Sequence, residues 1–268
     1  MERIRSKLQE KPKSRILKCG YINVYSKLTG QEERQIYYKT LYKKNNSEWD
    51  ESLVYLSKRF KEIVNPNSRL LDIGCGNGNY VVDENRKIIS WATGIDVSKK
   101  VVERNQCLDE IVIGNIEKIP FKDNSFDCVS GLWVLEHLEN PEKVLDQIYR
   151  VLKSKGKFIF VAPNINYLPL RLVMFVKFSK FNYLINKRLF GRERKDIFKT
   201  YYKANSVTRL KNLTNGKFRI LELRTNYDPS YTSFNQLTYK VTNFLNDIST
   251  KLGLTITHPH IVGIFEKK

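Results

Sequence analysis

The chain has 268 residues, 41% of them hydrophobic, and a mean hydropathy of −0.45, values that suit a globular protein. No apolar run reaches the roughly 20 residues that a membrane-spanning helix requires, which excludes a span of that kind. The formal net charge is +19 and favours anionic partners: phosphates, nucleic acid or an anionic membrane face.

Basic residues gather in two segments, 1–30 and 166–203. The first is expected to be an irregular basic arm, and it lacks the apolar core and the cleavage site of a secretory signal. We therefore expect a cytoplasmic protein, with peripheral contact at the inner face of an anionic membrane as a further expectation. A solvated basic surface without such a partner is the alternative.

From 31 to 64, apolar residues recur at three- to four-residue steps, which predicts helices. Strands then alternate with helices, and this rhythm predicts an α/β fold with a doubly wound, mostly parallel sheet. The predicted strands are 69–73, 90–95, 110–113, 126–130, 157–162 and 218–224, with an antiparallel last strand at 260–265. The predicted helices include 98–107 and one that Asn140 should cap ahead of Pro141.

Two insertions, 166–203 and 227–253, interrupt the rhythm after the strand at 157–162. The first combines aromatic and basic residues, and its stretch from Tyr167 to Phe178 is too apolar for an ordinary exposed helix. We expect either a lid over the site or a helix in the membrane plane with its cations at the headgroups.

A glycine-rich stretch follows the first predicted strand and holds Asp72, Gly74, Gly76 and Gly78. Glycines allow the backbone to approach a ligand at a helix N-terminus. The dinucleotide pattern fails because Asn79 stands where it requires a glycine, and the phosphate-loop pattern fails because no Gly-Lys-Ser/Thr follows. A carboxylate at Asp72 suits a ligand that carries an ammonium and a sulfonium.

Asp96 ends the second predicted strand, 24 residues past Asp72. A carboxylate at this place can accept hydrogen bonds from both hydroxyls of a ribose. A lone aspartate at a strand end can instead cap a helix, but the glycine stretch in register favours the ribose.

Two further segments, Gly114–Phe121 and Phe126–Leu138, complete a pattern that resembles the type 11 branch of class I S-adenosylmethionine-dependent methyltransferases over residues 68–163. The resemblance implies S-adenosylmethionine as cofactor and a Rossmann-like, seven-stranded sheet with helical insertions. It places in the cofactor site Asp72, Gly74, Gly76 and Gly78 (methionine part), Asp96 with Val97 (ribose), Asn115, Ile116 and Glu117 (adenine), and Gly131 and Leu132 (behind the sulfonium).

The resemblance also suggests a division of the chain. Residues 1–64 are expected to form a basic arm and helices that cover the donor site, and residues 65–268 the methyltransferase domain, with the two insertions on the acceptor side. Asn115 departs from the family, which usually has aspartate there, but an amide oxygen can still accept from the adenine amino group.

His137, after the fourth predicted strand, is the candidate catalytic base; a packing histidine bonded to backbone is the alternative. His258 and His260 flank the last strand and are further candidates, with an ordinary turn as the alternative. A base is needed only for a hydroxyl or a protonated amine. Related quinone methyltransferases carry a glutamate where Trp133 stands, so no metal site is predicted.

Three acceptor classes stay open. A sugar hydroxyl on a glycan or a lipid-linked acceptor is expected first, because it accounts for both the aromatic insertion and the basic charge. Phe198–Ser206 and Asp228–Ser233 also resemble the acceptor side of methyltransferases encoded with surface-glycan enzymes. A quinone or another small molecule is second. Nucleic acid is third, because the Asn/Asp-Pro-Pro-Tyr/Phe loop of enzymes that methylate base amino groups is absent after the fourth strand.

Overall fold

The computed structural model describes residues 3–5, 30–176 and 199–268, and its strands form one sheet in the order β1-β4-β3-β2-β5-β6-β8-β7. The strands are β1 (Arg3–Arg5), β2 (Ser68–Ile73), β3 (Ile89–Asp96), β4 (Glu110–Ile113), β5 (Phe126–Leu132), β6 (Leu152–Pro163), β7 (Phe218–Asn226) and β8 (His260–Lys267). The helices are α1 (Gly30–Asn45), α2 (Ser52–Ile63), α3 (Tyr80–Glu84), α4 (Lys99–Val102), α5 (Pro141–Val151), α6 (Leu168–Val176), α8 (Val207–Thr214) and α9 (Gln236–Lys251).

The sheet has the expected doubly wound arrangement. Strands β4-β3-β2-β5-β6 run parallel, and β8 lies antiparallel between β6 and β7. The order from β4 to β7 confirms the predicted seven-stranded class I fold with its antiparallel last strand. Parallel strands end at one edge of the sheet, where ligands bind in folds of this kind.

Strand β1 corrects the expectation of an irregular arm for three of its residues. Arg3–Arg5 pairs antiparallel with β4, with Arg3 opposite Val112. A sheet edge offers unpaired backbone groups to any extended segment that reaches it, which is the physical reason for this pairing. Residues 6–29 of the arm lie outside the described part of the chain.

Two helix predictions also need correction. The helix expected over 98–107 is only Lys99–Val102, after which the Asn105 side chain donates to two carbonyls of the turn after β2. Asn140 precedes α5 but makes no side-chain cap; its amide donates instead to Glu117 at 2.8 Å. In both places, an asparagine side chain expected to lie in a helix or to cap it bonds instead to a loop at the carboxyl edge of the sheet.

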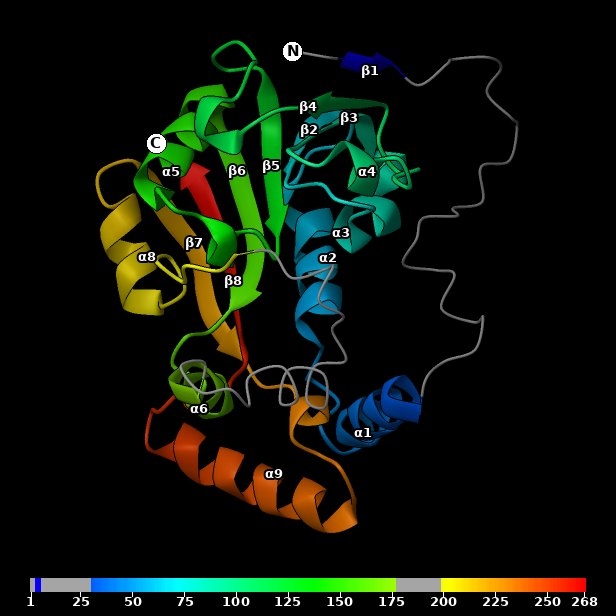
Figure 1. The fold of residues 1–268 in the computed structure, drawn as a ribbon, viewed down its shortest axis with the longest axis vertical. Helices are drawn as coiled ribbons and strands as arrows, with labels where there is room; N and C mark the ends of the chain where they lie inside the picture. Colours follow the sequence, from blue (N-terminus) through cyan, green and yellow to red (C-terminus); the bar gives the residue numbers. More distant parts are fainter. Residues whose placement is uncertain (1–2, 6–29, 177–198) are drawn as a thin grey trace.

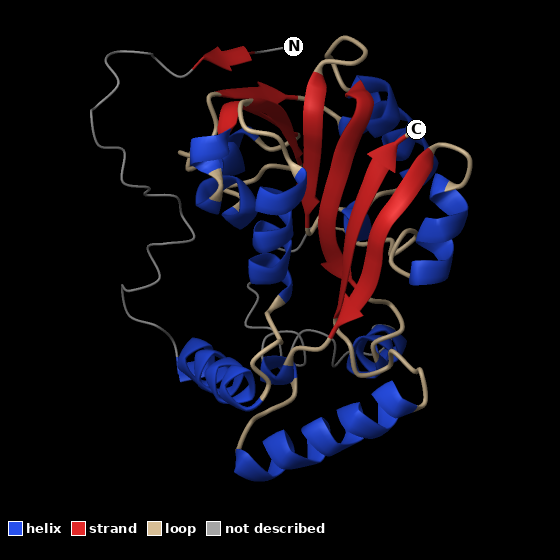
Figure 2. Cartoon of the chain, turned by 180° about the vertical axis from the view of Figure 1, so that it is seen from behind, coloured by secondary structure: helices blue, strands red, loops and turns tan. Residues whose placement is uncertain are grey.

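Helices cover both faces of the sheet (Figures 1 and 2). Side chains alternate between the two faces of a strand. On β6, Phe158 and Phe160 pack with α5 and α8, whereas Ile159 and Val161 pack with α2 and α3. All four side chains are fully buried. These two packed layers hold the strand ends, and with them the site, in place.

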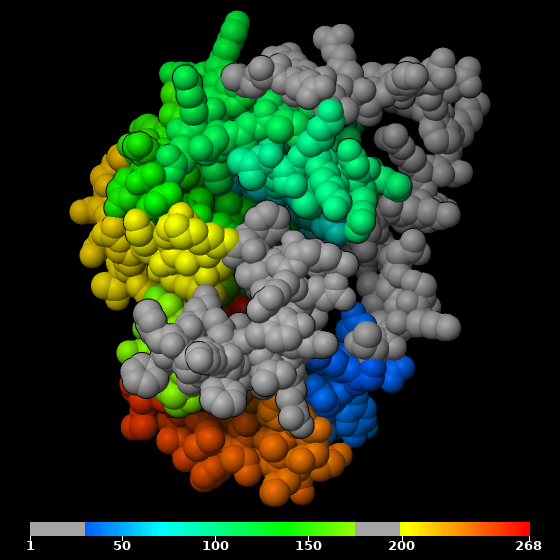
Figure 3. Space-filling view, viewed as in Figure 1, coloured from blue at the N-terminus to red at the C-terminus, as the bar shows by residue number. Residues whose placement is uncertain are grey.

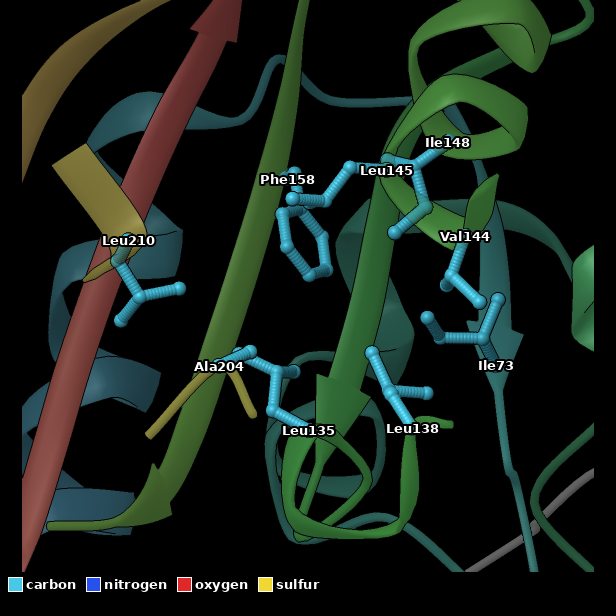
Figure 4. A pocket seen from close by; sticks show the side chains of 9 residues that line it. All are labelled: Ile73, Leu135, Leu138, Val144, Leu145, Ile148, Phe158, Ala204 and Leu210. Atoms are coloured by element: carbon cyan, nitrogen blue, oxygen red, sulfur yellow. The ribbon is translucent and has the colours of Figure 1, made fainter. Parts of the chain in front are cut away.

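Figure 4 shows nine side chains that pack between α5, α8 and the chain after β5 and leave no space for a water-sized molecule. Among them are Leu135 and Leu138, from the short 3-10 helix η4 (Leu135–His137) and the residue after it. Both are nearly fully buried, so this core anchors the turn that carries His137.

Helices α1, α6 and α9 lie beyond the ends at which β5 and β6 finish (Figure 1). α6 comes from the first predicted insertion and α9 from the second, whereas residues 177–198 lie outside the described part. The assignment of these insertions to an acceptor side or a lid therefore stays a prediction. Within the described ranges, no helix is long and apolar enough to cross a membrane.

Candidate functional site

The turn between β2 and α3 is shaped by its glycines. Gly74 and Gly76 have φ angles of 60° and 46°, a left-handed conformation that costs glycine little. A Cβ on Gly74 would lie 2.6 Å from a methyl of Val134, so a larger residue would displace the chain after β5. Gly76 donates its backbone N–H to Asp96, which ties the turn to the end of β3.

Asp72 is buried at the end of β2, and a network of side chains holds it. Its Oδ1 accepts hydrogen bonds from Asn79 and from the Ser130 hydroxyl, each at 2.7 Å. Its Oδ2 is buried and has no hydrogen-bond partner. Burial outweighs these two hydrogen bonds and raises the pKa of Asp72 to about 7. The free oxygen is thus available to a cationic ligand group.

Asn79 is the residue that organises this network. Its amide donates to Asp72 and to Ser130 on β5, while its carbonyl oxygen accepts from the N–H groups of Val81 and Val82 and caps α3. In the sequence, Asn79 serves only to exclude a dinucleotide, and no motif singles out Ser130. A polar residue in a buried strand beside Asp72 is the signal that could have found the serine.

Asp96 ends β3 next to the glycine turn. Its Oδ2 accepts from the N–H of Gly76 at 3.0 Å and its Oδ1 from the N–H of Ser98 at 2.8 Å. Each carboxylate oxygen can accept a second hydrogen bond, so both remain able to receive ribose hydroxyls. The next residue, Val97, is 66% exposed, which leaves an apolar surface beside the carboxylate.

These features fit S-adenosylmethionine, the cofactor that the sequence predicts. The unpartnered oxygen of Asp72 matches its ammonium, the glycine turn allows close approach, and Asp96 retains acceptor capacity for its ribose. The three parts come from β2, the turn after it and β3, which are adjacent and parallel. The arrangement suits a ligand that is positive at one end and carries a ribose at the other.

The predicted adenine segment is held by its own contacts. The Asn115 side chain accepts from the N–H of Glu117 and caps a 3-10 helix, and Glu117 in turn accepts from Asn140. Ile116 is partly buried against the core below. The structure thus brings these residues to the edge near β4, and their contact with adenine stays a prediction.

Gly131 and Leu132 end β5, between the ends of β2 and β6. A Cβ on Gly131 would lie 3.2 Å from Ile73, which accounts for glycine inside this strand. Trp133 follows with a φ of 58°, unusual for a residue with a side chain, and its ring lies edge-on to His260 with 4.9 Å between ring centroids. The tryptophan links the end of β5 to the start of β8.

His137 is partly exposed, and its Nδ1 lies 2.8 Å from the carbonyl of Lys199. A carbonyl only accepts, so Nδ1 carries the proton in this contact. Nε2 lies 3.9 Å from Glu136. This geometry matches the packing alternative, and the role of His137 as a base stays a prediction.

His260 is buried where α2 meets β8. Its Nδ1 lies 3.0 Å from the Ser52 hydroxyl and its Nε2 3.1 Å from the Tyr231 hydroxyl. Burial lowers the pKa of His260 to about 4, so the ring is neutral near pH 7. His258 contacts Thr225 instead. His260 and the segment Asp228–Ser233, which holds Tyr231, are among the features singled out in the sequence, but Ser52 is not, because 208 residues separate it from the histidine.

The raised pKa of Asp72 predicts a pH dependence. The folded carboxyl binds its proton more tightly than the unfolded one, so its contribution to the stability of the ligand-free protein is lost as pH rises from about 4 towards 7. A cationic ligand favours the carboxylate. Calorimetry should therefore show S-adenosylhomocysteine binding about tenfold more tightly at pH 8 than at pH 6.

The Asp72→Asn variant is the control for this prediction. It should bind more weakly at pH 8 and lose most of the difference between the two pH values, because the amide does not titrate. A wild-type affinity that is flat from pH 6 to pH 8 would show that Asp72 does not meet the ligand's positive charge.

Among the described residues, no group of three or more His, Cys, Asp or Glu side chains could hold a metal ion.

Comparisons with known proteins agree on the same region. Residues 71–160 match a family model described as a methyltransferase domain. Demethylmenaquinone methyltransferase of Symbiobacterium thermophilum is 28% identical over 149 residues, 48% of this chain and 59% of that protein. Sterol 4-C-methyltransferase of Caenorhabditis elegans is 32% identical over 107 residues, 36% of this chain and 31% of that protein.

A solved structure with the same fold is the S-adenosylmethionine-dependent methyltransferase of Mesorhizobium loti. It aligns with a TM-score of 0.52 at 15% sequence identity and covers 79% of this chain and 95% of that one. The sequence matches are shorter. The chain spans only 37–44% of the length of three further curated relatives that it matches.

Proposed function

We propose that the whole protein transfers a methyl group from S-adenosylmethionine, the donor implied by the methyltransferase domain matched over residues 71–160, to a small, largely apolar acceptor. The observation that carries the donor half is the paired arrangement of Asp72, with a free buried oxygen, and Asp96, tied to the glycine turn. The resemblance found in the sequence and the matched family model both indicate a methyltransferase.

The acceptor class rests on two supports. Relatives with assigned acceptors are named for menaquinone precursors and sterols, which favours the second expectation from the sequence, a quinone or another small molecule, over a sugar hydroxyl. The elements beyond the carboxyl ends of β5 and β6 also carry exposed apolar side chains, among them Leu168, Leu172 and Leu245. Contact with an anionic membrane or with nucleic acid stays a prediction.

When bound, S-adenosylmethionine would supply a methyl group on a positively charged sulfur. The acceptor atom would take this methyl group by in-line displacement of the sulfur. The chain positions the two reactants and keeps water away, and such positioning supplies a large part of the rate of a two-reactant step. Asp72 and Asp96 hold the donor from β2 and β3. Trp133 at the end of β5 contacts the neutral His260 at the start of β8, and the Tyr231 hydroxyl is bonded to the same ring.

Turnover should separate the acceptor classes. The full chain and S-adenosylmethionine are given a reduced quinone or a sterol. We expect S-adenosylhomocysteine to form at least about tenfold faster than the background rate. Nucleotide sugars and short RNA serve as parallel reactions. A rise with nucleotide sugars alone would contradict the apolar acceptor and restore the sugar hydroxyl.

A further inference from the structure

Helix α9 presents its polar and apolar residues the opposite way round from an ordinary surface helix. Its buried residues include Asn246 and Ser249, which bond to Thr257 and to the carbonyl of Leu254. A surface helix normally turns its apolar residues inward. On α9 these residues are 40–70% exposed: Leu237, Val241, Phe244, Leu245 and Ile248, with Leu252 just after the helix at 67%. Figure 3 shows the helix, in orange, on the outside of the molecule.

A cavity of about 330 Å³ lies between α6, α9 and the chain that follows α9. Its apolar lining includes Leu168 and Pro169 from α6, Leu245 and Ile248 from α9, and Leu252 and Ile256 beyond it. The other described lining residues are Leu254, two tyrosines, three threonines and a serine, and none is charged. The size falls at the lower end of the range for small-ligand sites, and the lack of charge disfavours phosphates and nucleotides.

One residue of the cavity wall is the chain neighbour of a residue at the candidate site. Thr232 lines it and directly follows Tyr231, whose hydroxyl contacts His260. Tyr167 also lines it; burial first, and then the nearby Tyr231 and Asp228, raise the pKa of Tyr167. His260 contacts Trp133 at the end of β5. Thr232 of the cavity wall is therefore connected, through its chain neighbour Tyr231 and then His260, to the strand end where the methyl group is expected.

The outer end of the cavity lies at the apolar surface. Leu245, Ile248 and Leu252 belong to its wall and are 50%, 40% and 67% exposed. An exposed apolar patch of this kind marks a place where an apolar molecule or surface is met. The part of the wall that α9 and the chain after it supply is thus both apolar and open to the surface.

We propose that this cavity binds the apolar chain of the acceptor, an alkyl or isoprenoid tail, and that the reactive end of the acceptor lies at Tyr231 and His260. The proposal rests on the proposed function for the reactive end, but the binding of a chain can be tested without turnover. It commits to one occupant, because an uncharged apolar lining beside a methyl-transfer site fits the tail of an amphipathic molecule.

The test uses the full chain and 11-(dansylamino)undecanoic acid, whose fluorescence rises in an apolar site. We expect saturable binding that decanol displaces. Ile248→Glu, which places a charge in the wall, should weaken binding at least about tenfold. Phe244→Glu is the matched control, because Phe244 is on the same helix and 64% exposed but does not line the cavity. This variant should bind like the wild type.

Three outcomes would overturn the proposal: no saturable binding to the wild type, equal loss in both variants, or no loss in either. Leu252→Glu, at another exposed wall position, gives a second measurement if Ile248→Glu unfolds. Binding of S-adenosylhomocysteine is measured in the same samples. Donor binding without probe binding removes the cavity proposal alone, whereas probe binding without donor binding removes the proposed function and leaves the cavity as an apolar site.

Discussion

Replacing Asp96 with alanine is expected to weaken the binding of S-adenosylhomocysteine about 10- to 100-fold, or about 1.4–2.8 kcal/mol. The side chain has two tasks in the structure. It accepts hydrogen bonds from the N–H groups of Gly76 and Ser98, and these bonds fix the glycine turn against β3. It is also the carboxylate expected to accept hydrogen bonds from the ribose hydroxyls. Alanine removes both and leaves polar groups unpaired. Calorimetry on the purified full chain measures the loss.

Two controls separate these tasks. Asp96→Asn keeps one carbonyl oxygen and should lose less affinity than alanine. Glu62→Ala changes a carboxylate on α2 that is 58% exposed, and it should leave binding unchanged. Unchanged affinity in Asp96→Ala, with an unchanged melting temperature, would remove Asp96 from the ligand site.

Replacing Asn79 with alanine is expected to destabilise the ligand-free protein by about 2–4 kcal/mol. The variant loses the cap of α3, whose N–H groups bond to the Asn79 carbonyl oxygen at 3.0 and 3.2 Å. It also removes one of the two donors to the buried Asp72 carboxyl. Urea unfolding of the wild type and the variant gives the difference.

Asn79→Ser divides the effect between its two causes. Serine is a good N-cap but is too short to keep the bond to Asp72 as well. We expect it to recover part of the stability that alanine loses. A stability equal to the wild type in Asn79→Ala would mean that the network of Asp72, Asn79 and Ser130 does not support the fold.

The sequence predicted the features that depend on local pattern. The alternation of strands and helices predicted the doubly wound sheet. The spacing of Asp72, the glycines and Asp96 predicted the methyl-donor side of the site, because these residues lie at or just after the ends of two successive strands. The Ser206 hydroxyl, which caps α8 by accepting from the N–H of Arg209, is a contact of this local kind.

Features that depend on contacts across the sheet could not be predicted in this way. Ser130 reaches Asp72 from β5, and Ser52 and Tyr231 reach His260 from elements far away in the chain. Asn140 satisfies the usual rule for an N-cap, yet bonds to Glu117, because a tertiary partner competes with the local one. The exposed apolar residues of α9 have helical spacing, and spacing alone cannot say which side of the helix faces the protein.

Direct binding of the donor tests the central claim. Equilibrium dialysis of the full chain with methyl-labelled S-adenosylmethionine should reach about one donor per chain, as expected for a single site. An excess of S-adenosylhomocysteine should displace the label, and an excess of NADH should not. No bound label on a folded protein, or displacement by NADH, would contradict a methyl-donor site built on Asp72, the glycine turn and Asp96.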